Sequence, residues 1–195
     1  MTVKIKLFLL LMMLCFCTTV KAQIEFAYLK SKNYSGFGLG GYLSFAIPVT
    51  DNGSVTGEAG LYYSWNFDYN HALLIPFLVG YRVMLNGLNQ GGYSYYDDDN
   101  SSGFYLQPVV GYSIGGTDIP RTDSTGQEVV DNNGNEIDEK ASGVTAGIVF
   151  GYIFPGRWAI NIGVRYEHVF VPSPDPAMNM LSLRLSHSLF PRRTN

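Results

Sequence analysis

The chain has 195 residues, enough for one domain, and is 46% hydrophobic but only 15% charged. Soluble domains carry roughly 25% charged residues, so the composition argues against an ordinary soluble fold. The formal net charge is −3, and the sequence holds no cluster of Lys and Arg, which argues against a nucleic-acid partner.

The N-terminus has the parts of a secretory signal peptide. Lys4 and Lys6 precede an apolar run over Leu7–Phe16, and Val20 and Ala22 place small residues at positions −3 and −1 of a cleavage site. We therefore predict a signal peptide over residues 1–22 and a mature domain over residues 23–195.

Cleavage there would remove Cys15 and Cys17, so the mature domain would have no disulfide and no thiolate metal site. It would also remove three of the 13 basic residues, which leaves 10 against 16 acidic residues and a net charge of −6. A lipoprotein signal needs small residues before its cysteine, but Leu14 and Phe16 stand there.

Eight segments of the mature domain alternate apolar residues with small or polar ones, and a period of two is typical of β-strands. In chain order they are Ile24–Lys32, Ser35–Pro48, Ser54–Phe67, Ala72–Leu85, Gly103–Gly115, the two arms of Ser142–Phe170 (which meet at Pro155-Gly156) and Asn179–Phe190. Pro76 and Pro108 each remove a backbone donor, so we expect a bulge or a local break at each.

The hairpin Ser142–Phe170 carries the clearest pattern. One face is continuously apolar, and the other is small and polar, with charge in the second arm. Each arm has about 12 residues, twice the usual strand length. Such a strand suits a tilted crossing of a bilayer, with the apolar face in lipid and the polar face in a lumen.

An even number of strands brings both ends of the barrel wall to the same side. In bacterial outer-membrane barrels that side is the periplasm, which holds short turns, while longer loops lie outside. The predicted periplasmic turns are Val49–Gly53, Asn86–Ser102 (longer than the rule) and Pro155-Gly156. The predicted outside loops are Ser31–Tyr34, Asp68–His71, Gly116–Lys140 and Val171–Met178. Within the third loop we expect a hairpin over Gln127–Asp138.

The runs GFGLGGYLSFAIPVTDNGSVTGEAGLYYSWNF, ALLIPFLVGYRV and GFYLQPVVGYSIGG, with the hairpin above, resemble the porin-family outer-membrane β-barrel domain. This resemblance covers nearly the whole mature domain. It implies an all-β fold, an eight-stranded antiparallel up-and-down transmembrane β-barrel like OmpA, in the outer membrane of a Gram-negative cell. It also implies the lipid bilayer with its outer-leaflet lipid and the barrel-assembly machinery as partners, and it implies no catalytic residue.

The polar face carries three acids and three bases that would point into the lumen. They are Glu25, Glu58, Arg82, Arg165, Glu167 and Arg184. The interior of an eight-stranded barrel is just wide enough for side chains, and buried charges must be paired. We expect a charge-balanced plug, with Glu58 beside Arg82 and Arg165 beside Arg184. A narrow channel with an ion-pair gate is the alternative. An acid–base catalytic pair is disfavoured because arginine does not release its proton.

Aromatic residues gather near the predicted strand ends, as in the two interfacial girdles of membrane barrels. We assign Trp65, Phe67, Trp158, Tyr166 and Phe170 to these girdles, with Trp158 at the periplasmic rim.

The remaining polar motifs have simpler explanations. The three histidines His71, His168 and His187 lack metal-binding spacing, and the acidic runs Asp97–Asn100 and Asp131–Glu136 fit solvated turns better than calcium sites. We therefore expect no catalytic residue, metal or cofactor.

These observations predict a monomeric outer-membrane barrel with a plugged, charge-balanced lumen, whose structural or binding role lies in its outside loops, toward an unknown extracellular ligand. Three alternatives remain open. They are a narrow porin for small solutes, an outer-leaflet lipid-modifying enzyme and a soluble, lipocalin-like barrel.

Overall fold

The computed structural model describes residues 21–50, 52–85, 102–122, 127–131, 133–154 and 160–188. Within these residues it has nine strands. They are β1 (Lys21–Lys30), β2 (Ser35–Thr50), β3 (Gly53–Trp65), β4 (His71–Met84), β5 (Gly103–Pro120), β6 (Asp138–Lys140), β7 (Gly143–Ile153), β8 (Asn161–Phe170) and β9 (Met178–Ser188). None of the described residues belongs to a helix long and apolar enough to cross a membrane.

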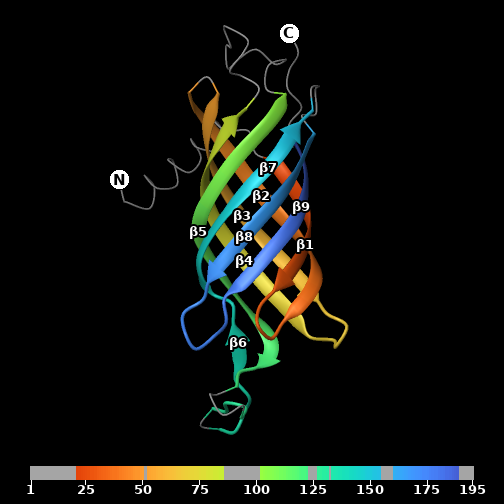
Figure 1. Cartoon of the computed structure of the whole chain (residues 1–195), viewed down its shortest axis with the longest axis vertical. Coiled ribbons are helices and arrows are strands. Elements are labelled where there is room, and N and C mark those ends of the chain that lie inside the picture. Colours follow the sequence, from red (N-terminus) through yellow and green to blue (C-terminus); the bar gives the residue numbers. More distant parts are fainter. Residues whose placement is uncertain are drawn as a thin grey trace, which may run out of the picture.

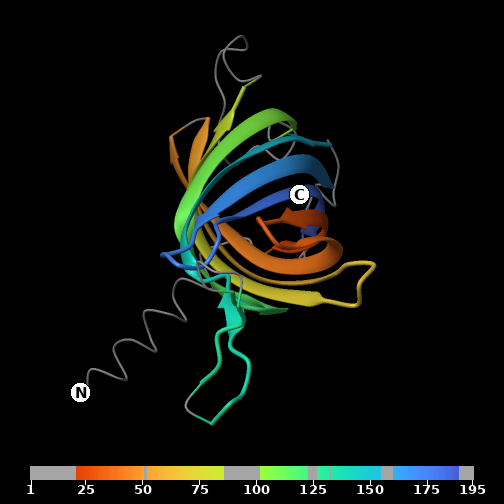
Figure 2. The same cartoon turned by 60° about the horizontal axis from the view of Figure 1, so that its bottom comes forward.

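Eight of the strands close into one antiparallel barrel, which confirms the predicted fold class (Figures 1 and 2). Around the ring the order is β4-β3-β2-β1-β9-β8-β7-β5, and β5 pairs back onto β4. The first and last strands pair along their length, from Lys21 opposite Ser188 to Lys30 opposite Asn179. The short β6 pairs only with β5 and extends beyond the barrel at the bottom of Figure 1.

Two ends of the barrel are distinguished by their connections. The β6 end, at the bottom of Figure 1, holds the β1–β2, β3–β4, β5–β7 and β8–β9 connections. The turn end, at the top, holds the adjoining ends of β2 and β3, of β4 and β5 and of β7 and β8, together with the start of β1 and the end of β9, which pair there. The predicted turn Pro155-Gly156 lies outside the described residues, as does the predicted turn Asn86–Ser102 except for Ser102 itself, and as do Asp51 and residues 1–20.

The strands are inside-out compared with those of a soluble protein, because their apolar side chains face outward. In β2, Phe37 and Leu43 are about 60% exposed, while the residues that follow them, Gly38 and Ser44, are buried. The same alternation runs through β8. A closed barrel with an apolar outer wall is the form in which strands can cross lipid, since closure pairs every strand edge.

Both prolines interrupt a ladder without shifting its register. Pairing of β3 with β4 stops after Ala59 opposite Phe77, beside Pro76, and resumes in the same register at Tyr62 opposite Leu74. The β4–β5 ladder has a matching gap opposite Pro108. The predicted local break is therefore present at each proline.

The long loop contains more strand than predicted. The fifth strand was expected to end at Gly115, but β5 continues to Pro120 because β6 pairs with this extension. Beyond it, a bridge between Val130 and Glu136 forms the expected hairpin, whose turn has Gly134 at a φ of 83°. Glycine adopts this left-handed conformation without steric cost.

The first strand was also expected to run from residue 24 to residue 32, but β1 begins at Lys21 and ends at Lys30. The proposed cleavage point after Ala22 therefore lies inside β1. Cleavage would leave Gln23, which is buried and donates to Ser44, as the first residue of the strand. The signal peptide itself stays a prediction.

Candidate functional site

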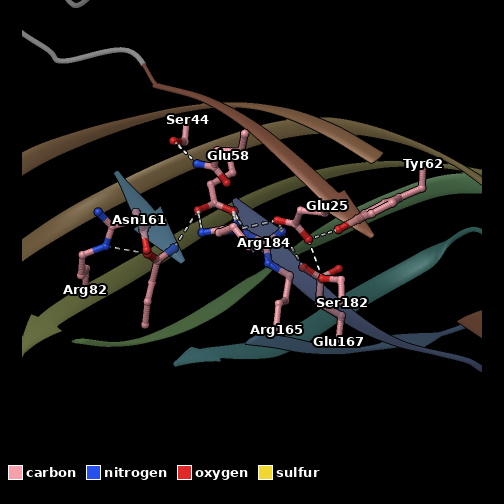
Figure 3. Close-up of polar contacts among 12 residues, drawn as sticks. Glu25, Ser44, Glu58, Tyr62, Arg82, Asn161, Arg165, Glu167, Ser182 and Arg184 are labelled. Atoms are coloured by element: carbon pink, nitrogen blue, oxygen red, sulfur yellow. Dashed lines mark hydrogen bonds and ion pairs between the residues drawn. The ribbon is translucent and has the colours of Figure 1, made fainter. Parts of the chain in front are cut away.

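All six ionisable residues assigned to the lumen are buried inside the barrel (Figure 3). Their exposed fractions are 0% for Glu25, Arg165, Glu167 and Arg184, 4% for Glu58 and 6% for Arg82. They come from β1, β3, β4, β8 and β9, so the cluster ties together strands around the whole ring.

Four of these residues form a central ion-pair network. Arg184 donates from Nη2 to Glu58 Oε2 at 2.8 Å and from Nε to Glu25 Oε1 at 2.8 Å. Arg165 donates from Nη2 to the same Glu58 Oε2, and its Nη1 lies 3.6 Å from Glu25 Oε1. Two acids and two bases thus neutralise each other in the middle of the lumen.

Neutral side chains complete the shell around the network. The hydroxyls of Tyr62 and Ser182 both donate to Glu25 Oε2, the latter at 2.5 Å. The guanidinium of Arg165 lies 4.5 Å from the ring centre of Tyr42, a cation–π contact. These contacts offset part of the cost of holding charges away from water.

The expected pairing of Glu58 with Arg82 is wrong. The β3–β4 register sets Glu58 opposite Leu78 and Arg82 opposite Ser54, four residues away along the strand. Gln107 bridges the gap. It accepts from Arg82 Nε at 2.9 Å and donates to Glu58 Oε1 at 2.8 Å. The residue pattern did not assign Gln107 to the lumen network, although Gln107 occupies an inward position of β5 between outward apolar residues.

Glu167 is less completely satisfied. Its Oε1 forms an ion pair with Arg165 Nη1 at 3.0 Å, but neither carboxylate oxygen accepts a hydrogen bond from any described residue. Arg165 Nε and Nη1 likewise donate none. The network is therefore tightly bonded on the Glu58 side and loose on the Glu167 side.

A second group of buried side chains, mostly apolar, faces the lumen toward the β6 end, and the residue pattern did not predict it. The apolar layer consists of Leu29, Leu74, Val169, Met178 and Met180, all at most 2% exposed. Leu29, Leu74 and Met180 could have indicated this layer from the sequence. They are large apolar residues at inward positions, where the other strands have polar or small residues.

Four of the five proposed girdle residues are exposed on the outer wall or at its rim. Trp65, Tyr166 and Phe170 are 44–54% exposed and Phe67 is 93% exposed, whereas Trp158 lies outside the described residues. A further aromatic group lies toward the turn end. There Phe104 packs on Phe150 and Tyr152, with ring centres 5.7 and 4.8 Å apart, and Tyr152 packs on Phe154 at 4.9 Å.

Other candidate sites are weaker. The described residues include no group of three or more His, Cys, Asp or Glu side chains placed to hold a metal ion. The carboxylate of Asp131 accepts from the backbone amides of Asn133 and Asn135 at 2.8 and 2.9 Å, as a carboxylate in a turn does. The acidic run over residues 97–100 lies outside the described residues.

The fold is similar to solved outer-membrane barrels. Neisserial surface protein A shares 12% identity, with a TM-score of 0.59 over 88% of this chain and 97% of that one. Ail, the attachment invasion locus protein of Yersinia pestis, shares 10% identity, with a TM-score of 0.54 over 87% of this chain and 96% of that one. At such identities the likeness concerns the fold alone.

No curated protein sequence matches the chain. A family model, the outer membrane protein beta-barrel domain, matches residues 8–187. The match spans every strand of the closed barrel described above. The chain therefore belongs to the outer membrane protein beta-barrel domain family, whose members reside in the outer membrane.

Proposed function

We propose that this protein is a structural or binding protein of the outer membrane, with a closed lumen and with its contacts to other molecules made through the loops at the β6 end. The observation that supports the proposal is that two groups of buried side chains lie inside the barrel at different levels. The ion-pair network of Glu25, Glu58, Arg165 and Arg184 lies in the middle, and the apolar layer lies toward the β6 end.

The two layers would oppose conduction for different physical reasons. Passage of an ion past the network requires Arg184 or Arg165 to leave Glu58, and an unpaired charge at a buried site costs several kcal/mol. The five side chains of the apolar layer carry no oxygen or nitrogen that could replace the hydration shell of an ion, although the buried hydroxyls of Tyr34 and Thr145 lie near them. Hydrophobic constrictions oppose the entry of water. Opening one layer would leave the other closed.

We assign the β6 end to the cell exterior, because β5 ends and β7 begins there with the longest connection between barrel strands, and long loops of outer-membrane barrels face outward. Arg121 in that connection donates to Asp175 in the β8–β9 loop at 2.8 and 2.6 Å. This contact would hold two loops together as one surface for an extracellular ligand. We further propose a monomer inserted by the barrel-assembly machinery.

Single-channel recording in planar bilayers tests the closed lumen. The refolded wild type is expected to be silent, and so is an Arg165→Ala/Arg184→Ala double variant, because the apolar layer is retained. An Arg121→Ala variant, changed only in a loop, is the control for insertion. Steady conductance of the wild type would contradict the proposal.

A narrow channel is the second candidate, and the loose side of the network favours it. Glu167 has an ion pair with Arg165 but no hydrogen bond from a described residue, so Arg165 could change partners at modest cost. This candidate predicts conductance from the double variant. Silence of that variant would exclude the ion-pair gate.

We propose no enzymatic activity. Glu25 and Glu58, the best-bonded acids of the lumen, are engaged by arginine, which does not exchange protons at useful pH. Mass analysis of lipid A from cells with and without the protein checks this, since a lipid-modifying enzyme would change the mass distribution.

A further inference from the structure

A row of polar side chains crosses four adjacent strands on the outer wall near the β6 end. The ladders place Ser35 opposite Lys30, Lys30 opposite Asn179, and Asn179 opposite His168. We call these four residues the basic row. Lys30 and Ser35 are exposed, and Asn179 and His168 are half-buried. The row interrupts a wall that is otherwise apolar.

Two donors of the basic row, the Lys30 ammonium and the Asn179 amide, are available to an anion. Tyr166 donates its hydroxyl to Asn179 Oδ1 at 2.7 Å, and His168 Nδ1 lies 2.8 Å from the same oxygen. The carbonyl of Asn179 is thus occupied, which leaves its amide NH₂ to donate. In the part of the chain that the structure describes, Lys30 has no hydrogen bond or ion pair from its ammonium. No carboxylate stands among the described outward residues of β1, β2, β8 and β9.

An apolar groove of about 520 Å³ lies on the outer wall next to the basic row. It lies between the basic row and the middle of the barrel wall. Two rows of large side chains border it. Phe37, Tyr28 and Leu181 form the nearer row, and Leu39, Phe26 and Leu183 form the farther one. Trp65 and Val164 close its sides, and the small residues Gly38, Ala27 and Ser182 lie between the rows.

The groove and the basic row are directly connected. Tyr28, which lines the groove, is the next outward residue to Lys30 on β1, two positions before it. Its hydroxyl is 2.7 Å from Ser35 Oγ in the basic row. A molecule with an anionic head and an apolar tail could therefore bind with its head at the basic row and its tail in the groove at the same time. The tail would point toward the middle of the membrane, which is the direction of a lipid in a bilayer.

We propose that the basic row and the groove together bind one membrane lipid of the leaflet at the β6 end, with its anionic phosphate headgroup at Lys30 and Asn179, beside His168, and one acyl chain in the groove. The proposal rests on residence in the outer membrane and not on a closed lumen. The lumen could conduct or stay silent without affecting this site, which faces the opposite side of the wall.

Trp65 provides a direct reporter, because it lines the groove and the chain has only two tryptophans. In a Trp158→Phe background, Trp65 fluorescence is recorded in phosphatidylcholine vesicles containing a small fraction of lipid with dibrominated acyl chains. Bromine quenches tryptophan on contact. The brominated lipid is either phosphatidylglycerol, which is anionic, or phosphatidylcholine at the same fraction.

The expected result is stronger quenching by phosphatidylglycerol, equivalent to a preference of about fivefold from the Lys30 ammonium near the headgroup. A Lys30→Gln/His168→Gln variant should quench equally with both lipids. Lys140→Gln, which removes an exposed lysine from β6 away from the groove, should keep the preference. Equal quenching of the wild type by the two lipids overturns the proposal, and so does a preference that survives loss of Lys30 and His168.

A second pair of variants tests the groove separately from the charge. Val164→Phe fills the groove and should reduce quenching by both lipids. Val110→Phe makes the same change at an outward position of β5, across the barrel from β1, and should leave quenching unchanged. Heat-modifiable mobility on gels verifies that each variant is folded. Full quenching in Val164→Phe would show that no acyl chain occupies the groove.

Discussion

Arg165 on β8 and Glu58 on β3 belong to strands on opposite sides of the eight-stranded ring, and their side chains meet across the lumen. Arg184, on the strand next to β8, donates to the same carboxylate at 2.8 Å. Glu58 is thus the anion on which two arginines converge. This geometry makes the stability of the barrel sensitive to one carboxylate.

Glu58→Gln should destabilise the barrel by about 3–5 kcal/mol, because it leaves two buried guanidinium groups with too little negative charge. Urea unfolding of the protein refolded in lipid vesicles measures the change. Glu136→Gln removes the same charge from an exposed loop position and should behave as wild type. An unchanged midpoint for Glu58→Gln would show that the network contributes little.

Gly40 and Gly41 are adjacent on β2 but differ in the space around them. A Cβ on Gly40 would overlap the ring of Tyr62, whereas a Cβ on Gly41 would meet nothing nearer than an oxygen of Gln23 at 3.9 Å. Gly40→Ala should therefore displace the tyrosine that donates to Glu25 and cost about 1–3 kcal/mol, as overpacking does. Gly41→Ala is the control, and equal midpoints in urea would contradict the assignment of faces.

Ile162→Arg tests the lipid-facing wall. Ile162 is 42% exposed and lies between Tyr152 and Leu185 on neighbouring strands. Ile162 is the second residue of β8, at the turn end, so an arginine there should cost about 1 kcal/mol, the cost of a charge on the lipid face near a membrane interface. Val130→Arg makes a similar substitution in the loop beyond the barrel, where water solvates the charge. Equal stability of both variants in vesicles would place Ile162 away from lipid.

The contact between Arg121 and Asp175 should hold the loops at the β6 end. Because it is a bidentate pair with the Asp175 side chain only 5% exposed, its loss should loosen the long loop. Asp175→Asn is expected to speed trypsin cleavage after Arg121 several-fold. Asp138→Asn, at an exposed position of the same loop, is the control. Unchanged cleavage of Asp175→Asn would mean that other contacts order this region.

Strand positions could be predicted from the sequence because lipid and lumen impose opposite polarities on alternate residues. In β2 and β9, for example, the predicted and observed ends differ by two residues at most. The fifth strand is different. Its last residues, Asp118–Pro120, extend past the last β4 partner, Ala72 opposite Thr117, and Pro120 pairs instead with Asp138 of β6, far along the chain.

The lumen residues could be assigned to a face, but not to partners. Whether Glu58 meets Arg82 or Arg184 depends on the register between strands and on the reach of long side chains across the barrel, and neither is local in sequence. The apolar layer was missed for another reason. Leu74 and Met180 look like continuations of the outward apolar pattern unless the phase of each strand is followed residue by residue.

The seam between β1 and β9 has a consequence for the order of assembly. Glu25 and Arg184 are directly opposite each other across this seam, so their ion pair cannot form until the last strand of the chain meets the first. Until the strands pair, the backbone groups at two strand edges and the charged side chains of the lumen lack protein partners and must be hydrated. A chain truncated before β9 would leave Glu25 without Arg184 and the edge of β1 unpaired on that side, so closure of the barrel and completion of its ion-pair network both require β9.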